Sequence, residues 1–208
     1  MDYTPQGYEF WRDRRIRDSH RDWNYGGKSW ITDYVLSVEH PHRSLIIEAL
    51  KTLEPYESLL EIGCSAGPNL LRIHGKKLAG IDANAKSIEA AKTILPDVDL
   101  RVGNMIELPW NDKSFDILLA DASLMYISPE DIDKMMKEID RVTKKGVVII
   151  DRFNESLNGE VGGYVWARNY PRLLEIMGFK VTVKKITEEL WPDSKNWQLY
   201  GVIVTAKR

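Results

Sequence analysis

The sequence predicts an α/β protein built on one parallel β-sheet, and two observations lead to this prediction. From about Ser58 onward, short apolar runs alternate with longer amphipathic segments, which is the pattern of strands joined by crossover helices. The apolar runs are continuous, as expected of strands that helices cover on both faces. The five predicted parallel strands are Leu59–Ile62, Leu78–Ile81, Val98–Val102, Phe115–Ala120 and Val147–Asp151.

Helical patterns lie between these strands. The second of them opens just after Asn84, whose side chain suits a helix cap, and the fourth ends at Gly178, a residue type that commonly follows the last turn of a helix. The four predicted helices are Asn69–His74, Ala85–Leu95, Pro129–Thr143 and Tyr164–Met177.

The pattern changes after Gly178. Phe179–Ile186 alternates apolar with polar or basic residues, and Trp197–Thr205 is a second β-rich run. With no helix predicted between them, the two runs form an antiparallel hairpin whose loop is Glu188–Asn196. Seven strands are therefore expected in total.

The first 54 residues differ from the rest. They are rich in aromatic residues set among charges, and a helix-like stretch follows from His42 to Leu53. We predict an N-terminal lid or extension over residues 1–54 and an α/β core over residues 55–208. Ligands bind beyond the carboxyl ends of the strands, so the lid would place Tyr25, Trp30, Tyr34 and His40 nearest the cleft.

Composition excludes several classes of protein. The chain has 208 residues, 29 Lys and Arg against 31 Asp and Glu, and a formal charge of −2, so no overall positive field favours nucleic acid. The run Trp11–Arg21 holds five arginines, but acids interrupt it, and a solvated helix face with internal ion pairs is the favoured interpretation. The single cysteine, Cys64, permits no intramolecular disulfide. Without an apolar leader or a membrane-spanning run, a cytoplasmic location is expected.

A loop of small residues follows the first strand and reads Gly63-Cys64-Ser65-Ala66-Gly67. Small residues let the backbone approach a ligand, and a helix beginning after Gly67 would present free N–H groups to an anion. A nucleotide-like ligand is therefore expected. The dinucleotide motif G-x-G-x-x-G fits poorly, because Ser65 replaces its second glycine and Pro68 follows, so a nicotinamide cofactor is the less favoured alternative.

Further motifs follow at regular intervals. Asp82 ends the second predicted strand beside the loop, where its carboxylate can accept hydrogen bonds from two ribose hydroxyls. Gly103-Asn104-Met105 comes after the third strand, and the segments Leu108-Pro109-Trp110 and Phe115-Asp116 precede or open the fourth.

Taken in order, these motifs resemble the class I S-adenosylmethionine-dependent methyltransferases. The resemblance covers about 150 residues and implies a seven-stranded Rossmann-like sheet, mostly parallel, with a C-terminal antiparallel hairpin and helices on both faces. The last strand is expected beside the fifth. The resemblance also implies that the cofactor is S-adenosylmethionine and that a methyl group is transferred to an oxygen or nitrogen atom of a small molecule.

The family's cofactor contacts transfer to the matching positions of this sequence. Two departures from the family pattern stand out: Asn104 replaces a usual aspartate, and Ser65 replaces a frequent glycine, which the loop tolerates if the φ of Ser65 is negative. The implied roles are the methionine moiety for Gly63, Cys64, Ser65 and Gly67, loop orientation for Glu61, the ribose for Asp82, adenine packing for Ala83, the adenine edge for Asn104 and Met105, and a further cofactor contact for Asp121.

The catalytic candidates are Asp121, His40 and Tyr25. Asp121 could act as a base, or it could merely cap the loop after the fourth strand. Histidines near a helix start, such as His40 and His42, are more often surface or capping residues. No metal site is expected, because Arg152 stands where metal-assisted relatives favour asparagine. The expected partner is a small-molecule acceptor, and the alternatives are methylation of RNA or protein and a non-catalytic subunit that binds the cofactor.

Overall fold

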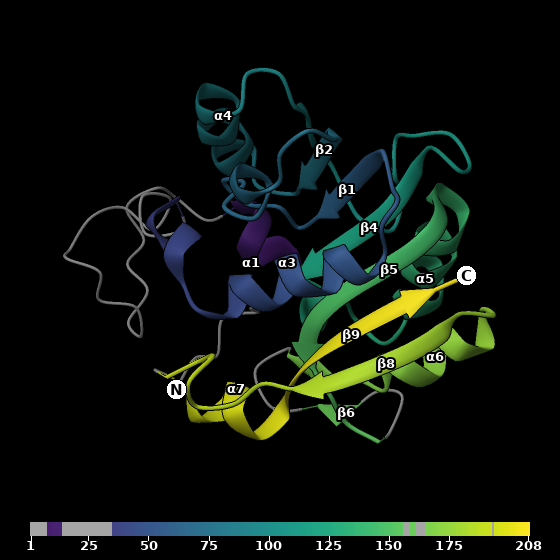
Figure 1. The fold of residues 1–208 in the computed structure, drawn as a ribbon. Helices are drawn as coiled ribbons and strands as arrows, with labels where there is room; N and C mark the ends of the chain where they lie inside the picture. Colours follow the sequence, from purple (N-terminus) through teal and green to yellow (C-terminus); the bar gives the residue numbers. More distant parts are fainter. Residues whose placement is uncertain (1–7, 14–34, 156–158, 161–164, 193) are drawn as a thin grey trace.

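A seven-stranded sheet forms the centre of the molecule (Figure 1). The structure is a computed structural model that describes residues 8–13, 35–155, 159–160, 165–192 and 194–208. The strand order is β3-β2-β1-β4-β5-β9-β8, in which the first five strands are parallel and β9 lies antiparallel between β5 and β8. The strands are β1 (Ser58–Ile62), β2 (Lys77–Asp82), β3 (Asp99–Val102), β4 (Phe115–Asp121), β5 (Thr143–Arg152), β8 (Lys180–Lys185) and β9 (Gly201–Lys207).

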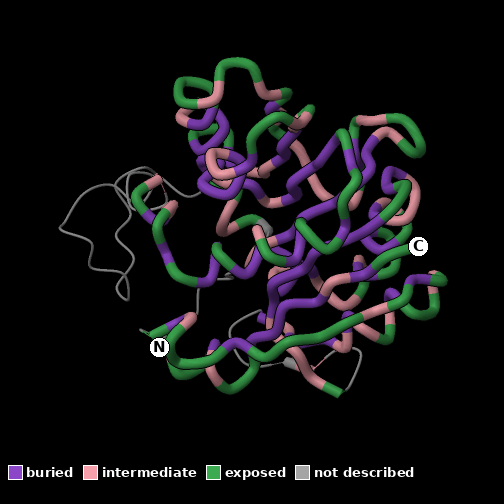
Figure 2. Tube along the Cα trace, in the orientation of Figure 1, coloured by how far each residue is buried: buried purple, intermediate pink, exposed green. Residues whose placement is uncertain are grey.

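This topology confirms the predicted sheet. Each of the five parallel strands lies where its apolar run predicted it, and the last strand is inserted beside β5. Figure 2 shows why the runs are continuous: the central strands are buried along their length, and all five residues of β1 are buried. Such burial on both faces removes the polar alternation of a half-exposed strand.

Two predicted helices differ from the structure. The predicted helix Asn69–His74 is only a 3₁₀ turn, η2 (Leu70–Arg72), because Gly75 follows with a φ of +68° and leaves too few residues to nucleate an α-helix. The predicted helix from Tyr164 begins only at Tyr170, where Asn169 caps it, because β7 (Trp166–Ala167) pairs with β6 (Gly159–Glu160).

A third difference lies in the C-terminal hairpin. A helix, α7 (Lys195–Tyr200), occupies the start of the predicted last strand, and β9 begins only at Gly201. The prediction that no helix separates β8 from β9 was therefore wrong. The aromatic residue Trp197 suggested a strand, but it is buried from the helix instead, against Trp191 at a ring distance of 4.2 Å.

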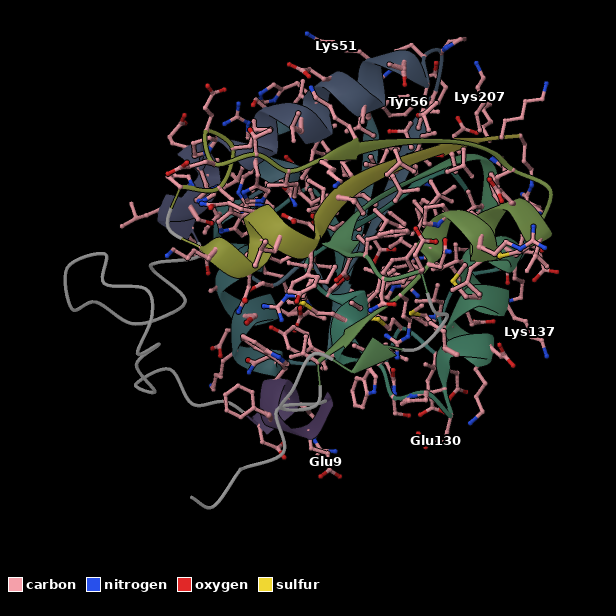
Figure 3. The ribbon with its side chains drawn as sticks, turned by 90° about the horizontal axis from the view of Figure 1, so that it is seen from below. Glu9, Lys51, Tyr56, Glu130, Lys137 and Lys207 are labelled. Carbon is pink, nitrogen blue, oxygen red and sulfur yellow. The ribbon has the colours of Figure 1, made fainter. Side chains whose placement is uncertain are left out.

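Helices cover both faces of the sheet. One face carries α3 (His42–Thr52), α4 (Ala85–Ile94) and α7, and the other carries α5 (Ile132–Val142) and α6 (Tyr170–Ile176). Figure 3 shows Lys51 of α3 and Lys137 of α5 pointing to solvent on opposite sides. Because strand side chains alternate, the core residues divide into two clusters, with Leu119 and Ile150 on the α3 face and Leu118 and Ile149 on the α5 face.

The sheet has one topological switch point, between β1 and β4. From β1 the chain moves outward through β2 and β3, and then returns to build β4 and β5 on the other side. In open α/β sheets a crevice forms beyond the carboxyl ends of the strands at such a point. The loops at residues 63–69, 82–84 and 121–126 all lie at this edge.

The N-terminal residues meet the core in two places. The helix α1 (Tyr8–Asp13) lies at the carboxyl edge, where Asn84 Nδ2 donates to the Trp11 carbonyl over 2.8 Å and the Trp11 and Tyr126 rings are 5.1 Å apart. In contrast, α3 belongs to the main core through Ile46 and Leu50. The predicted lid residues Tyr25, Trp30 and Tyr34 lie outside the described residues. In the described part of the chain, no helix is long and apolar enough to cross a membrane.

The packing of α3 predicts a stability difference between two adjacent residues. Leu50 is 3% exposed in the core, whereas Lys51 projects into solvent. We expect Leu50→Ala to lower the free energy of unfolding by roughly 2–4 kcal/mol, because it leaves a cavity. Lys51→Ala should change it by less than about 0.5 kcal/mol. Urea unfolding followed by circular dichroism measures both, and equal effects would contradict the assignment of α3 to the core.

Candidate functional site

The glycine loop turns sharply above the end of β1. Gly63 and Gly67 have φ values of +70° and +78°, and the Gly63 and Cys64 amides donate to the Ile81 carbonyl over 2.8 and 3.1 Å. A side chain at Gly63 would place its Cβ 2.3 Å from the Cβ of Ser123. Glycine is therefore required at this point, because the loops after β1 and β4 meet there.

Ser65 corrects one expectation. Its φ is +48°, so the residue adopts the left-handed conformation, and the condition of a negative φ is not met. The Asp82 side chain holds it there, since the Ser65 amide donates to Asp82 Oδ2 over 2.8 Å. The Ser65 Oγ is buried and has no hydrogen-bond partner among the described residues. Within the described structure, the loop thus holds a buried hydroxyl that makes no hydrogen bond.

Asp82 joins the glycine loop to the start of α4. Its Oδ2 accepts from Ser65, and its Oδ1 accepts from the amide of Asn84 over 2.8 Å. Burial raises the pKa of Asp82, although these two N–H bonds oppose the rise. Each carboxylate oxygen has two lone-pair positions, so each keeps one acceptor position for a ligand. Ala83, half-buried, comes directly after it.

The residues after β3 lie close to the same loop. The Met105 Cε lies 3.6 Å from the Cβ position of Gly63, so this side chain reaches across from β3 to β1. The Asn104 Oδ1 accepts from the amide of Ile106 over 3.2 Å and thereby shapes its own turn. Cys64 points the other way: its thiol is buried in the core beside Gly80, so only its backbone faces the loop.

The expected helix N-terminus after Gly67 is absent from this described loop, because η2 is a single turn of three residues. That correction removes the anion site predicted there. The residue following Pro68 takes a different role: Asn69 Nδ2 donates to Glu61 Oε1 over 2.7 Å and to Asp121 Oδ2 over 3.0 Å. The loop therefore connects to a polar network beneath it.

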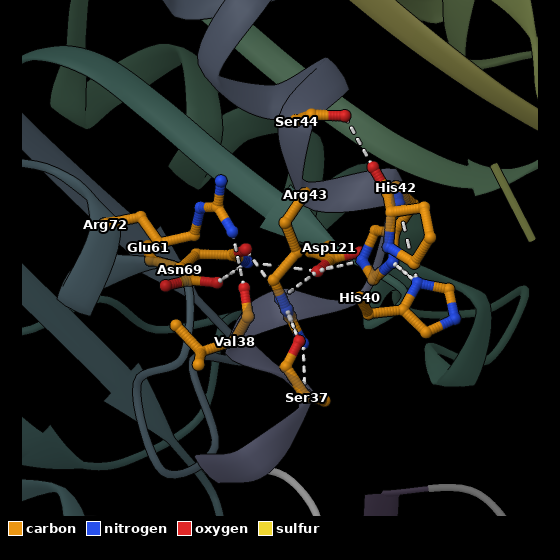
Figure 4. A network of polar contacts seen from close by, with 11 residues as sticks. Ser37, Val38, His40, His42, Arg43, Ser44, Glu61, Asn69, Arg72 and Asp121 are labelled. Carbon is orange, nitrogen blue, oxygen red and sulfur yellow. Dashed lines mark hydrogen bonds and ion pairs between the residues drawn. The ribbon is translucent and has the colours of Figure 1, made fainter.

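Asp121, at the end of β4, is the centre of this network (Figure 4). Its Oδ2 accepts from His42 Nε2 over 3.0 Å and from Arg43 Nη1 over 2.9 Å, in addition to Asn69. Arg43 also donates to Asn69 Oδ1 over 2.6 Å and to both oxygens of Ser37 over 2.7 Å. The first turn of α3 is thereby fixed to the carboxyl edge of the sheet.

His40 reaches Asp121 through His42. The Nδ1 atoms of the two imidazoles are 2.5 Å apart, so one must donate to the other. Burial lowers the pKa of His42, and burial together with the neighbouring His42 and Arg43 lowers the pKa of His40 to about 4. Both rings are therefore neutral at pH 7. The Asp121 carboxylate favours the His42 proton on Nε2, and in that tautomer His40 Nδ1 donates the shared proton to His42 Nδ1. The backbone amide of His42 also points at His40 Nδ1, over 3.4 Å.

An aromatic column fixes the plane of His42. Its ring stacks on Trp191 at 4.2 Å and 21°, and Trp191 stacks on Trp197 at 4.2 Å and 10°. The His40 ring lies 4.9 Å from Trp191 as well. Trp191 comes from the loop between β8 and α7, so the C-terminal hairpin covers the same edge that α3 closes from the other end of the chain.

The two carboxyl groups of the network, Asp121 and Glu61, differ in their protonation. Burial raises the pKa of Asp121, but His42, Arg43 and Asn69 outweigh it, and the pKa falls well below its usual range. For Glu61, burial dominates and raises the pKa to about 8, with the charge of Asp121 adding to the rise. Asp121 is thus ionised and Glu61 protonated at neutral pH. Asp121 Oδ1 and Glu61 Oε2 are buried without hydrogen-bond partners in the described part of the chain.

Sequence patterns pointed to the residues of the glycine loop but missed several residues that contact Asp121 and His42. Of the three catalytic candidates, the structure brings Asp121 and His40 together through His42, and Tyr25 lies outside the described residues. Arg43, Asn69 and Trp191 were missed. The expectation that His40 and His42 are surface or capping residues was wrong, because both are buried, and the His42 side chain is 2% exposed. The helical period held a signal for it. His42 lies three and four positions before the buried Leu45 and Ile46, and so belongs to the buried stripe of α3.

Other predicted features have simpler outcomes. Of the arginine-rich run, the structure describes Arg12, which forms an ion pair with Asp13 at 2.6 Å, while Arg14 to Arg21 lie outside the described residues. Among the described residues, no group of three His, Cys, Asp or Glu side chains is arranged to share a metal ion.

Comparison with known proteins gives a consistent set of relatives. A family model described as a methyltransferase domain matches residues 60–150. The ubiquinone biosynthesis O-methyltransferase of Pelagibacter ubique is 31% identical over 125 residues, covering 57% of this chain and 51% of that enzyme. The norajmaline N-methyltransferase of Rauvolfia serpentina is 25% identical over 122 residues, covering 51% of this chain and 41% of the enzyme.

Solved structures agree with the fold. A SAM-dependent methyltransferase from Aquifex aeolicus superimposes with a TM-score of 0.58 at 20% identity, covering 84% of this chain and 97% of that one. Curated relatives also include uncharacterised methyltransferases of Schizosaccharomyces pombe and Synechocystis sp., of whose lengths the chain spans 35% to 59%.

The buried Glu61 predicts an unusual dependence of stability on pH. An unfolded glutamate ionises near pH 4.5, whereas folded Glu61 holds its proton to about pH 8. Between these values only the unfolded chain releases the proton, so the free energy of unfolding falls as pH rises. Glutamine has no proton to release in this range, so Glu61→Gln should not show this fall in the free energy of unfolding. By pH 9 it should be more stable than the parent by roughly 3–5 kcal/mol, and about equal to it at pH 4.

Urea unfolding of the protein without ligand at pH 4 and pH 9 measures this difference. Glu57→Gln, an exposed residue just before the same strand, is the matched control and should follow the parent at both pH values. A gain for Glu61→Gln that is the same at both pH values would contradict the assignment of a protonated Glu61.

Proposed function

This chain belongs to the class I S-adenosylmethionine-dependent methyltransferases, and from that membership we propose that it transfers a methyl group from S-adenosylmethionine to an oxygen or nitrogen atom of a small molecule. Such a reaction requires residues that bind the methyl donor and the acceptor, and it gains from a group that takes up the acceptor's proton. The carboxyl edge of the sheet offers candidates for each of these tasks.

The residues at the carboxyl edge fit this cofactor by their donor and acceptor chemistry. Asp82 keeps one acceptor position on each oxygen, which matches the two hydroxyls of a ribose. Ser65 Oγ, Glu61 Oε2 and Asp121 Oδ1, which have no partner among the residues that the structure describes, are the polar atoms that a methionine ammonium and carboxylate would satisfy. These unpaired buried atoms around one glycine loop are the observation that carries the proposal.

The remaining contacts follow from neighbouring positions. The turns at Gly63 and Gly67 keep the loop backbone open to the methionine part, while Ala83, Asn104 and Met105 border the adenine part. When bound, S-adenosylmethionine supplies an electrophilic methyl group on a positively charged sulfur. The ionised Asp121 at the end of β4 favours that positive charge and helps to hold it at the switch point.

Removal of a proton is the second task of such a site. An O–H or N–H acceptor loses a proton when it is methylated, and a nearby base speeds the reaction. We assign this role to His40. In the tautomer with its proton on Nδ1, neutral His40 can accept the acceptor's proton on Nε2 and pass its Nδ1 proton to His42. The cation then lies beside the carboxylate of Asp121. Asp121 and His42 thus orient and stabilise the base.

The named relatives differ in acceptor atom, and one of them, the sterol 4-C-methyltransferase of Caenorhabditis elegans, is named for methylation of carbon. The Pelagibacter relative is named for O-methylation and the Rauvolfia relative for N-methylation. A base is most useful to a hydroxyl, whose oxygen is a weak nucleophile until its proton is removed, whereas a neutral amine can attack first. The proton relay, in which His40 passes a proton to His42 beside Asp121, therefore favours a hydroxyl acceptor.

Cofactor binding provides the first test. Asp82→Asn keeps the size of the side chain but removes its charge and one acceptor oxygen, so S-adenosylmethionine should bind about 30- to 150-fold more weakly, or roughly 2–3 kcal/mol. Isothermal titration calorimetry measures the change. Asp97→Asn, on the exposed segment before β3, is the control and should bind as the parent does. Unchanged affinity in Asp82→Asn would contradict the ribose assignment.

Loss of the base provides the second test. We expect His40→Ala to lower kcat for methyl transfer about 100- to 10,000-fold while the affinity for S-adenosylmethionine stays the same. Because the pKa of His40 is about 4, activity of the parent should not depend on this residue's titration above pH 5, and it should decline as pH falls toward 4.

Release of S-adenosylhomocysteine, with an acceptor found by mass-spectrometric screening, measures both quantities. His74→Ala, an exposed histidine on the loop before β2, is the control and should retain full activity. A His40→Ala enzyme as active as this control would remove His40 from the mechanism, and leave the cofactor assignments untouched.

A further inference from the structure

Arg152 is the last residue of β5 and lies at the carboxyl edge of the sheet. Along this strand Val148 and Ile150 belong to the core cluster of the α3 face, so by strand alternation Arg152 lies on that face too. Glu61 and Asp121 end on the same face of the two neighbouring strands, since Leu59 and Leu119 share the cluster. Three charged or acidic residues thus follow one edge, from β1 through β4 to β5.

Arg152 differs from the other described arginines by having no polar partner for its side chain within the described part of the chain. Its Nε is buried and makes no hydrogen bond there, and its guanidinium forms no ion pair with a described residue. Each of the others donates a hydrogen bond to a carboxylate or a carbonyl, or forms an ion pair with a carboxylate: Arg12, Arg43, Arg72, Arg101, Arg141, Arg168, Arg172 and Arg208. The carboxyl of Asp151 interacts with the Arg152 charge only through space. A half-buried cation that hydrogen-bonds to no anion among the described residues is costly, which favours a site completed by an anion.

The surroundings of Arg152 place it on the acceptor side of the site. Most of the proposed cofactor contacts lie at the ends of β1, β2 and β3, and Asp121 on β4 is the last of them, so we expect the methyl acceptor to approach over β4 and β5. The guanidinium carbon lies 5.7 Å from the ring of Trp197, which stacks on Trp191 and through it on His42. An aromatic column therefore connects the unpaired cation with the proposed proton relay.

We propose that Arg152 binds an anionic group, a carboxylate or a phosphate, of the methyl acceptor. This inference rests on the proposed function, since it assumes that an acceptor enters over β4 and β5. The planar guanidinium presents paired N–H donors that match either anion. Arg152 is then a specificity residue: it selects acidic acceptors and orients them, and takes no part in the removal of the proton.

The carboxylate of the cofactor itself is the other possible source of the anion. The cofactor carboxylate has the same chemistry as an anionic group of the acceptor, but its expected position differs. The glycine loop follows β1, whereas Arg152 lies two strands away on β5. The two sources have different consequences for a substitution. If the anion belongs to the acceptor, replacing Arg152 leaves cofactor affinity unchanged.

Benzoate and benzamide are suitable probes, because they share a ring and differ in the negative charge. We would titrate each, and inorganic phosphate, into the full-length protein with and without S-adenosylhomocysteine, following the ¹H–¹⁵N resonance of the Arg152 Nε. Benzoate or phosphate should shift this resonance and bind at least tenfold more tightly than benzamide. Arg152→Gln should weaken anion binding at least tenfold, and Arg152→Lys should weaken it less.

Arg172→Gln, on α6 at the opposite face, is the matched control and should bind the probes as the parent does. Calorimetry of S-adenosylhomocysteine on the same samples, and their circular dichroism spectra, separate the outcomes. The proposal is overturned if benzoate and benzamide bind alike, if folded Arg152→Gln keeps the parent's anion affinity, or if it loses cofactor affinity instead. Failure of the parent to bind S-adenosylhomocysteine would overturn the proposed function, whereas anion binding would still be measured without it.

Discussion

The carboxylate of Asp121 is the contact on which the rest of the site depends. One of its oxygens accepts hydrogen bonds from α3, through His42 and Arg43, and from the loop after β1, through Asn69. A buried carboxylate needs such partners, because an ionised group without them would take up a proton. By satisfying this one charge, the protein joins the helix α3, the glycine loop and the central strand β4 at the switch point of the sheet.

The same network leaves neighbouring atoms ready for a ligand. With Asp121 holding the negative charge, nearby Glu61 stays protonated, and within the described structure one oxygen of each remains unpaired beneath the glycine loop. Buried polar atoms without partners cost stability, and they are tolerated in native proteins where a ligand or water completes them. The stability lost in the free protein is thus linked to affinity for a cofactor with an ammonium and a carboxylate.

Two distant parts of the chain close this edge. The aromatic column of His42, Trp191 and Trp197 packs the C-terminal hairpin against the start of α3, so the geometry of the relay depends on the insertion of β9. Helix α1 reaches the edge near Asn84 and Tyr126. The proposed acceptor side is therefore assembled from both ends of the chain, whereas most of the proposed cofactor contacts come from a continuous stretch. This difference allows relatives to share a donor and differ in acceptor.

Local patterns in the amino-acid sequence were enough to predict the sheet and, by resemblance, the place of its last strand beside the fifth; the roles of the loop residues from Glu61 to Asp82 stay predictions. Apolar runs, turn residues and motif spacing each depend on neighbours within a few positions. The left-handed Ser65, the single turn η2 and the helix α7 were not predicted, because packing decided each of them. Folding of the whole chain was needed to pair His42 with Asp121, which lie 79 positions apart, and to leave Arg152 without a partner among the described residues. Such contacts follow from how strands and helices pack together, which no local pattern encodes.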